Sequence, residues 1–94
     1  DVFELHGHRI EVIHTPGHSQ GCVCFYLYED GILFSGDTLF QNSIGRTDLP
    51  GGDYGQLIES IKSRLLVLQD EVKVLPGHGE FTTIGAERKH NPFL

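Results

Sequence analysis

Three times in this chain an apolar run ends at a glycine beside a side chain that can bind a metal. These stretches are residues 14–21 (HTPGHSQG), 34–40 (FSGDTLF) and 75–79 (LPGHG). Pro16 and Gly17 separate the two histidines of the first stretch and exclude a helix there. Each stretch therefore predicts a tight loop at the end of a strand, and such a loop can hold a side chain in the single direction that a metal site requires.

The composition is that of a folded chain and excludes several function classes. Of the 94 residues, 38% are hydrophobic and 21% are charged, which excludes a disordered chain. No apolar run approaches the roughly 20 residues that cross a bilayer, so we expect no membrane partner. The net charge of -6, with no basic cluster, argues against nucleic acid as a partner.

The length and the missing methionine bear on domain organisation. Ninety-four residues make one small domain or part of a larger one. Because the sequence contains no methionine, we expect a processed or truncated piece of the encoded protein. The whole of residues 1–94 is predicted to be a single partial domain.

Cys22 and Cys24 lie two residues apart on a strand-like run, so both are predicted to point to one face. A disulfide between such neighbours has poor geometry. We interpret them as two small core residues in a reducing cytoplasm, and a thiolate metal pair is the alternative.

The remaining pattern predicts strands and one long helix. A turn at residues 6–9 makes His6 and His8 turn residues rather than metal ligands, and His14 is expected to hold its loop by a hydrogen bond. Asp53 and Gln56 form a capping box, and Thr83 is placed to cap a short helix over residues 86–89. Strands are expected over residues 2–5, 10–13, 22–28, 32–34 (buried on both faces) and 72–75, and the helix stripe consists of Tyr54, Leu57, Ile58, Ile61, Leu65 and Leu68.

Three candidate ligands stand at these strand ends: His18, Asp37 and His78. A carboxylate that follows a buried strand needs a positive partner, which a metal or an arginine would supply. Two imidazoles and a carboxylate suit zinc, and they also suit non-haem iron. The alternative is three unrelated loops, each satisfied by backbone groups, and the residues alone leave both interpretations open.

Residues 41–52 form a polar, glycine-rich loop that contains Arg46 and Asp48. Its length and charges favour a functional loop at the rim of a site. A plain surface loop in which Arg46 pairs with Asp48 explains the same residues equally well.

Taken together and in this order, the motifs H-T-P-G-H-S-Q-G, F-S-G-D-T-L-F, I-G-R-T-D and L-P-G-H-G resemble the metallo-β-lactamase superfamily. Within it they are similar to the small glyoxalase II-like hydrolases, including an ending of the form T-T-I-G-x-E-R-x-x-N-P-F-L over residues 82–94. The resemblance covers residues 1–94.

The resemblance implies a fold of mixed α and β structure (α/β, more narrowly α+β). It is the C-terminal half of an αββα sandwich, a mainly antiparallel sheet with one long and one short helix. The family motif H-x-H-x-D-H is absent from the 94 residues. The resemblance further implies two zinc ions in the complete protein, with iron or manganese as alternatives. His18 would complete the first metal site, Asp37 would bridge the two metals, and His78 would bind the second.

The implied activity is hydrolysis of a small-molecule thioester such as an S-acylglutathione by a cytoplasmic enzyme, with Arg46 facing an anionic substrate. One alternative is a persulfide dioxygenase with a single iron. Another is a non-catalytic half-domain that is inactive by itself and associates as a homodimer through an exposed sheet face.

Overall fold

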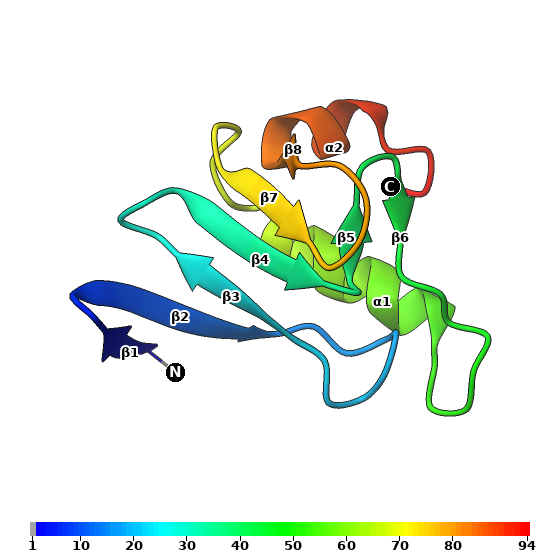
Figure 1. Ribbon diagram of the computed structural model, residues 1–94. Coiled ribbons are helices and arrows are strands. Elements are labelled where there is room, and N and C mark those ends of the chain that lie inside the picture. The colour runs from blue at the N-terminus through cyan, green and yellow to red at the C-terminus, as the bar shows by residue number, and fades with distance from the viewer. Residues whose placement is uncertain (1) are drawn as a thin grey trace.

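The computed structural model describes residues 2–94 and forms one sheet with helices on one side. Figure 1 shows the six strands in front and the longer helix behind them. The strands run in the order β1-β2-β3-β4-β7-β8. Their bounds are β1 (Val2–Leu5), β2 (His8–His14), β3 (Val23–Leu27), β4 (Ile32–Gly36), β7 (Lys73–Pro76) and β8 (Thr82–Thr83).

Three further elements complete the molecule. A hairpin of β5 (Leu39–Phe40) and β6 (Ser43–Ile44) makes a separate two-stranded sheet. The longer helix begins as α1 (Tyr54–Ser60) and continues as the π-helical turn η1 (Ile61–Leu65), and α2 (Ile84–His90) follows β8. The mixed, mainly antiparallel fold with one longer and one shorter helix confirms the predicted fold class.

Strands β1 to β4 form an antiparallel meander. Tight turns join β1 to β2 and β3 to β4, and the loop of residues 15–22 joins β2 to β3. The first turn is tighter than predicted, because β2 already begins at His8. Only His6 and Gly7 remain in the turn, both with positive φ (52° and 82°), as two-residue hairpin turns require. The expected turn at Asp30 and Gly31 joins β3 to β4.

Strand β7 pairs with β4 in parallel, and the chain between them carries the β5–β6 hairpin and the longer helix. In a parallel pair the carboxyl ends of both strands lie at the same edge of the sheet. Asp37 directly follows β4, and His78 follows β7 after one residue. The topology therefore brings these two residues to one edge.

The longer helix is capped and packed as its sequence predicts, with two exceptions. The Asp53 side chain accepts a hydrogen bond from the Gln56 amide, but the Gln56 side chain bonds to Gln20 instead of completing the capping box. Tyr54, placed in the apolar stripe by its spacing, is 55% exposed because it opens the helix at the surface. The fully buried members of the stripe are Leu57, Ile61 and Leu65.

The core lies between the sheet and this helix. Cys24, Leu33 and Val74 are fully buried there. The expectation that residues 32–34 are buried on both faces is wrong: Leu33 is buried, while the neighbouring Phe34 is 42% exposed. Successive strand residues point to opposite faces, and no element of residues 2–94 covers the face to which Phe34 belongs.

Helix α2 connects the β5–β6 hairpin to the main sheet through hydrogen bonds. Thr83 caps it as predicted, and the helix runs from Ile84 to His90. The buried Glu87 carboxylate accepts hydrogen bonds from the Asn42 amide, the Thr82 hydroxyl and the Asn91 side chain. This buried charge is thus fully hydrogen-bonded, as a stable interior requires.

In residues 2–94 no helix reaches the length and apolar content that crossing a lipid bilayer requires.

Candidate metal centre

The three predicted ligands lie together at one edge of the sheet. His18 Nε2 is 3.8 Å from Asp37 Oδ2, and His78 Nε2 is 3.6 Å from Asp37 Oδ1. The three side chains come from the loops after β2, β4 and β7. Asp37 thus lies between two imidazoles, and each of its oxygens faces a different ring.

His18 is held in one orientation by the backbone. Its Nδ1 lies 2.7 Å from the Arg46 carbonyl oxygen. Because a carbonyl only accepts hydrogen bonds, Nδ1 carries the proton, and in the neutral ring Nε2 presents its lone pair toward Asp37. A backbone carbonyl that fixes the tautomer of a histidine in this way is typical of metal-binding imidazoles.

Gly45 makes this close packing possible. Its amide donates to the Thr38 carbonyl over 3.0 Å, which lays the backbone of residue 45 directly on Asp37. A Cβ atom at this position would lie 1.9 Å from the Asp37 carbonyl oxygen and 3.3 Å from His18 Cβ. Any side chain would therefore push the Arg46 carbonyl away from the histidine that it orients.

The loop that carries His18 rests on the longer helix in a similar way. A Cβ at Gly17 would lie 2.3 Å from Leu57 Cα, so only glycine permits this contact. The Gly17 carbonyl accepts from the Asp53 amide, and the Pro16 carbonyl accepts from the Ser60 hydroxyl. His14 Nε2 lies 2.8 Å from the Gln20 carbonyl oxygen, which confirms the predicted loop-holding role of His14.

His78 is less constrained than His18. Its side chain is 82% exposed, compared with 22% for His18. It follows Gly77, whose amide donates to the Gly36 carbonyl over 2.9 Å. The backbone thus fixes where His78 stands, while its ring remains open to solvent.

The donor set fits a metal, but it does not enclose one. Two ligands about 2.1 Å from the same tetrahedral ion are roughly 3.4 Å apart, close to the observed 3.8 Å and 3.6 Å. Nevertheless, within residues 2–94 no three His, Cys, Asp or Glu side chains are arranged to hold one ion. The described residues supply two ligand pairs that share Asp37, and each pair needs further ligands.

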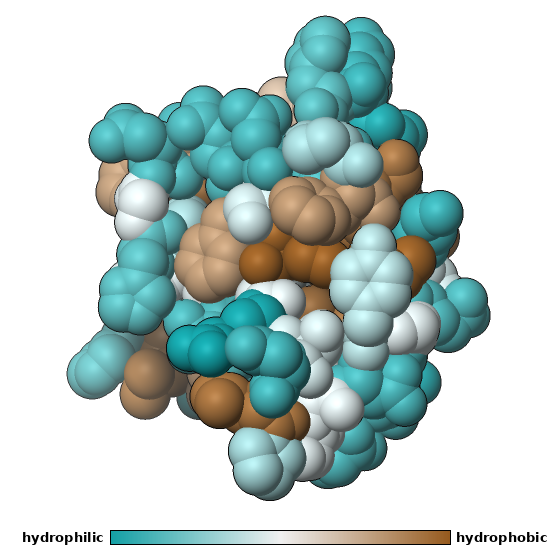
Figure 2. All heavy atoms as spheres, turned by 90° about the vertical axis from the view of Figure 1, so that its right-hand side faces the viewer, coloured by the Kyte–Doolittle hydropathy of each residue, from teal (hydrophilic) through white to brown (hydrophobic). Residues whose placement is uncertain are grey.

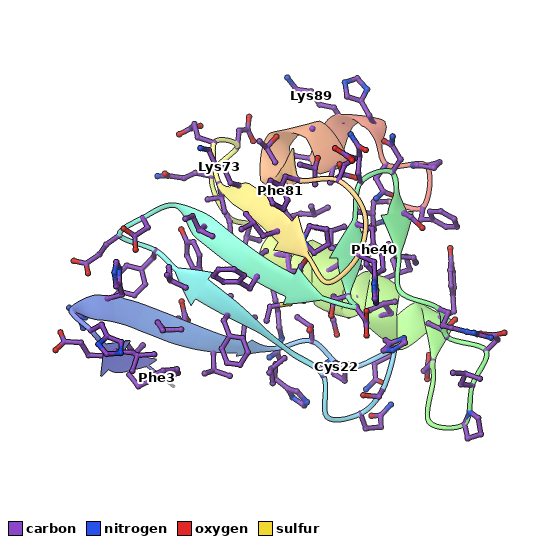
Figure 3. All side chains as sticks on the ribbon, viewed as in Figure 1. Phe3, Cys22, Phe40, Lys73, Phe81 and Lys89 are labelled. Carbon is purple, nitrogen blue, oxygen red and sulfur yellow. The ribbon has the colours of Figure 1, made fainter. Side chains whose placement is uncertain are left out.

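The same residues line a hollow of about 300 Å³, formed by His18, Asp37, Phe40, Gly45, Arg46 and His78. A second hollow of about 310 Å³ shares Gly45 and Arg46 with the first and is also lined by Tyr54 and Phe93. Figure 2 shows this side of the molecule with apolar residues at its centre and hydrophilic residues around them. Phe40, the last residue of β5, contributes apolar surface to the first hollow and is labelled in Figure 3.

Arg46 pairs with Asp48 and is also one of the residues that line the hollow. Its Nε and Nη2 atoms donate to the two Asp48 oxygens over 2.8 and 3.0 Å, as the surface-loop interpretation predicts. This pairing lowers the pKa of Asp48 and raises the pKa of Arg46. Arg46 also lines the hollow beside Asp37, and a functional role for its loop stays a prediction.

Among the described residues, no other histidine or cysteine lines the hollow around Asp37. His8 Nδ1 lies 2.9 Å from Asp30 Oδ2, which links the first residue of β2 to the turn between β3 and β4. Both cysteines are free; Cys24 is fully buried, and that burial raises the pKa of its thiol. Cys22 is half-buried and precedes β3. The prediction of a core residue is therefore confirmed for Cys24 and only partly met by Cys22.

Sequence reasoning missed Phe40 and Gly45 as parts of the site. The role of Phe40 could not be predicted from its type, since an apolar residue in a short strand is usually interpreted as a core residue. Gly45 stands in the I-G-R-T-D motif, and that motif was the only available signal.

The chain was compared with known proteins. The metallo-β-lactamase superfamily matches residues 1–78. "Hydroxyacylglutathione hydrolase GloC" of Haemophilus influenzae is 48% identical over 94 residues, which are 100% of this chain and 44% of the relative. The chain thus spans less than half the length of this curated relative.

Two solved structures are similar over nearly the whole chain. "BLEG-1 B3 metallo-beta-lactamase" is 50% identical with a TM-score of 0.94, and covers 98% of this chain and 44% of its own. "TTHA1623 in a di-iron-bound form" is 52% identical with a TM-score of 0.89, and the match covers 98% and 45% of the two chains.

Proposed function

The chain belongs to the metallo-β-lactamase superfamily, and from this premise we propose that it supplies part of the active site of a metal-dependent thioester hydrolase. The substrate class is an S-acylglutathione, after the name of the Haemophilus relative. The observation that carries the proposal is the arrangement of His18 and His78 on opposite oxygens of Asp37.

We propose that the complete site holds two zinc ions, with iron or manganese as alternatives. His18 would belong to the first metal, His78 to the second, and Asp37 to both, because each of its oxygens faces a different histidine. Bound metal of this kind lowers the pKa of water toward neutrality and polarises a carbonyl group. The di-iron form of a solved relative supports a site for two metals.

Residues of this chain would orient a metal ligand, exclude water and attract the substrate. The Arg46 carbonyl keeps His18 Nε2 directed at the site, and Gly45 allows the approach that this bond requires. Phe40 would exclude water from one wall of the hollow. Arg46 would attract an anionic group of the substrate, because this residue lines the hollow and its side chain is exposed.

A chimera tests this function with the residues of this chain. The 94 matching residues of the Haemophilus relative are replaced by this sequence, and hydrolysis of an S-2-hydroxyacylglutathione is followed by release of the thiol. We expect activity, and we expect Asp37→Asn to lower kcat about a hundredfold or more, because the amide cannot supply two anionic oxygens. His8→Gln is the matched control, since His8 is paired with Asp30 far from the site.

Metal content gives a second readout. After exhaustive dialysis, elemental analysis should find about two metal ions in the chimera and fewer than one in the 94-residue chain, which lacks a closed ligand set. A folded, metal-loaded chimera that leaves the thioester intact, under conditions where the Haemophilus protein cleaves it, would contradict the proposal. One iron, with oxygen uptake on glutathione persulfide, would identify the persulfide dioxygenase alternative.

The role of Arg46 is tested separately in the chimera. Arg46→Ala should raise KM about tenfold with a smaller change in kcat, as loss of a binding contact does. Asp48→Asn is the control, because it removes the pairing carboxylate and leaves the cation in place. An unchanged KM for Arg46→Ala would exclude this role.

A further inference from the structure

Helix α2 carries a carboxylate, that of Glu87, which is only 1% exposed. Its Oε1 atom accepts hydrogen bonds from the Asn42 backbone amide over 2.8 Å and from the Asn91 side chain over 2.9 Å, and its Oε2 atom accepts from the Thr82 hydroxyl. The buried Asn91 side chain also donates to the Ser43 carbonyl over 3.0 Å. Glu87 and Asn91 thus hold the turn of the β5–β6 hairpin at residues 42 and 43, and we call these bonds the hairpin clamp.

The β5–β6 hairpin needs such an anchor, because it forms a sheet of its own beside the main sheet. Strand β5 is fixed by Leu39, which is fully buried and whose carbonyl accepts from the Ser35 hydroxyl. Strand β6 pairs with β5 through two residue pairs, and its Ile44 is only partly buried against the core. A two-stranded hairpin of this size is marginally stable by itself. The clamp acts at Ser43, the first residue of β6, and Figure 1 shows the hairpin turn beside α2.

Strand β6 leads directly into the residues that orient a predicted metal ligand. The Gly45 amide donates to the Thr38 carbonyl, and the Arg46 carbonyl accepts from His18 Nδ1. Three residues separate Ser43 from Arg46, a span of about 10 Å in an extended chain. A shift of β6 at its clamped end is therefore passed over a short distance to the carbonyl that fixes the His18 ring.

We propose that Glu87 and Asn91 are positioning residues for the candidate metal centre. The hairpin clamp sets the place of β6 and thereby keeps the Arg46 carbonyl on His18 Nδ1. Neither residue lines the hollow, so both act through the hairpin and not by contact with metal or substrate. The expected effect on catalysis rests on the proposed function, whereas the expected effect on the His18 ring does not.

Two substitutions of Glu87 separate the clamp from the negative charge. Glu87→Met keeps the length of the side chain but removes both acceptors, which leaves the Asn42 amide without its partner. In Glu87→Gln the amide oxygen can still accept from Asn42 and Asn91, and its NH₂ group can donate to the Thr82 hydroxyl, which is also an acceptor. We therefore expect Glu87→Met to release the hairpin and Glu87→Gln to retain it.

Arg88→Met is the matched control on the same helix. The Arg88 guanidinium donates to the Asp70 carboxylate and to the carbonyls of Leu66 and Leu68, which all lie at the end of the longer helix and its following turn. This substitution also removes several hydrogen bonds of α2, but none of them reaches the hairpin. It measures what a general loss of stability does to the site.

The first readout is the tautomer of His18 in the metal-free form of the chimera described above. Nitrogen NMR of histidine-labelled protein at about pH 8, where a neutral imidazole predominates, shows which ring nitrogen carries the proton, and His18→Gln assigns the signal. We expect the proton on Nδ1 alone in the wild type, in Glu87→Gln and in Arg88→Met. In Glu87→Met we expect both tautomers, because the hydrogen bond that selects one of them is weakened.

The second readout is thioester hydrolysis by the metal-loaded chimera. Glu87→Met should lower kcat about tenfold, the lower end of the effect of losing an outer partner of a ligating histidine. Glu87→Gln should restore most of the lost rate, and Arg88→Met should lower the melting temperature without lowering kcat at 25 °C by more than about twofold.

A folded Glu87→Met variant in which His18 keeps its proton on Nδ1 alone would overturn the proposal. Equal tautomer mixtures in Glu87→Met and Arg88→Met would also overturn it, since general loosening would then explain both. If circular dichroism shows that Glu87→Met is unfolded, Asn91→Ala replaces it, because this change removes the bond to Ser43 and leaves the Glu87 bonds to Asn42 and Thr82 in place. A chimera that cleaves no thioester would contradict the proposed function, and the metal-free His18 signal would still decide the role of the clamp.

Discussion

The two faces of the sheet differ in how far their apolar residues are exposed to solvent, as two neighbouring residues show. Leu33 and Phe34 are consecutive on β4, yet Leu33 is fully buried against the helix and Phe34 is 42% exposed. The face toward the helix, the covered face, contains the hydrophobic core, while the face that carries Phe34 has apolar residues that no element of residues 2–94 covers. The helix, rather than the hydrophobicity of the strand, therefore decides which residues stabilise the isolated chain.

The largest effect expected from this comparison is on stability. Leu33→Ala should lower the free energy of unfolding by about 3 kcal/mol, because it leaves a cavity in the core. Phe34→Ala should cost about 1 kcal/mol or less at concentrations where the chain is monomeric. Chemical denaturation followed by circular dichroism measures both free energies, and equal losses would show that the face carrying Phe34 is covered in solution.

The two cysteines give a chemical measure of the same difference. Cys24 belongs to the covered face, where burial raises the pKa of its thiol, whereas Cys22 precedes the strand and is half-buried. Since only the thiolate reacts, a thiol reagent near pH 8 should label Cys22 in the folded chain and Cys24 only after unfolding. Cys22→Ser identifies the reacting residue, and rapid labelling of that variant would contradict a tightly closed covered face.

The smallest effect concerns Asp48, which is exposed beside the site. The hydrogen bond from Arg46 lowers the pKa of Asp48. The stabilisation from this pair is therefore fully present above the usual pKa of an aspartate, and it is lost as the pH falls through the lowered pKa. An NMR titration should find the pKa of Asp48 higher in Arg46→Gln than in the wild type. An unchanged value would show that the pair does not persist in solution.

Local sequence signals predicted the elements well. The strand segments, the Asp53 and Thr83 caps and the loop-holding bond of His14 follow from nearby residues, and the structure confirms them. The exposure of Phe34 and Tyr54 could not be predicted in the same way, because it depends on what packs against them. An apolar strand looks the same whether one face or both faces are covered.

The site was predicted as a set of residues but not as a geometry. Glycine beside each candidate ligand marked His18, Asp37 and His78, and the structure brings these three side chains together. The contact of Gly45 with Asp37 and the bond from His18 to the Arg46 carbonyl depend on the path of the β5–β6 hairpin. No local sequence pattern determines the path of the hairpin. For this reason the packing role of Gly45 could not be predicted.

The parallel pairing of β4 with β7 also affects the order in which the chain can fold. Antiparallel neighbours in the meander are joined by connections of at most eight residues and can pair within about microseconds, whereas β7 reaches β4 only after the crossover of residues 37–72 has closed. His18 and Asp37 both belong to the early part, and His78 arrives with β7. During synthesis, the first ligand pair would therefore assemble before the second exists.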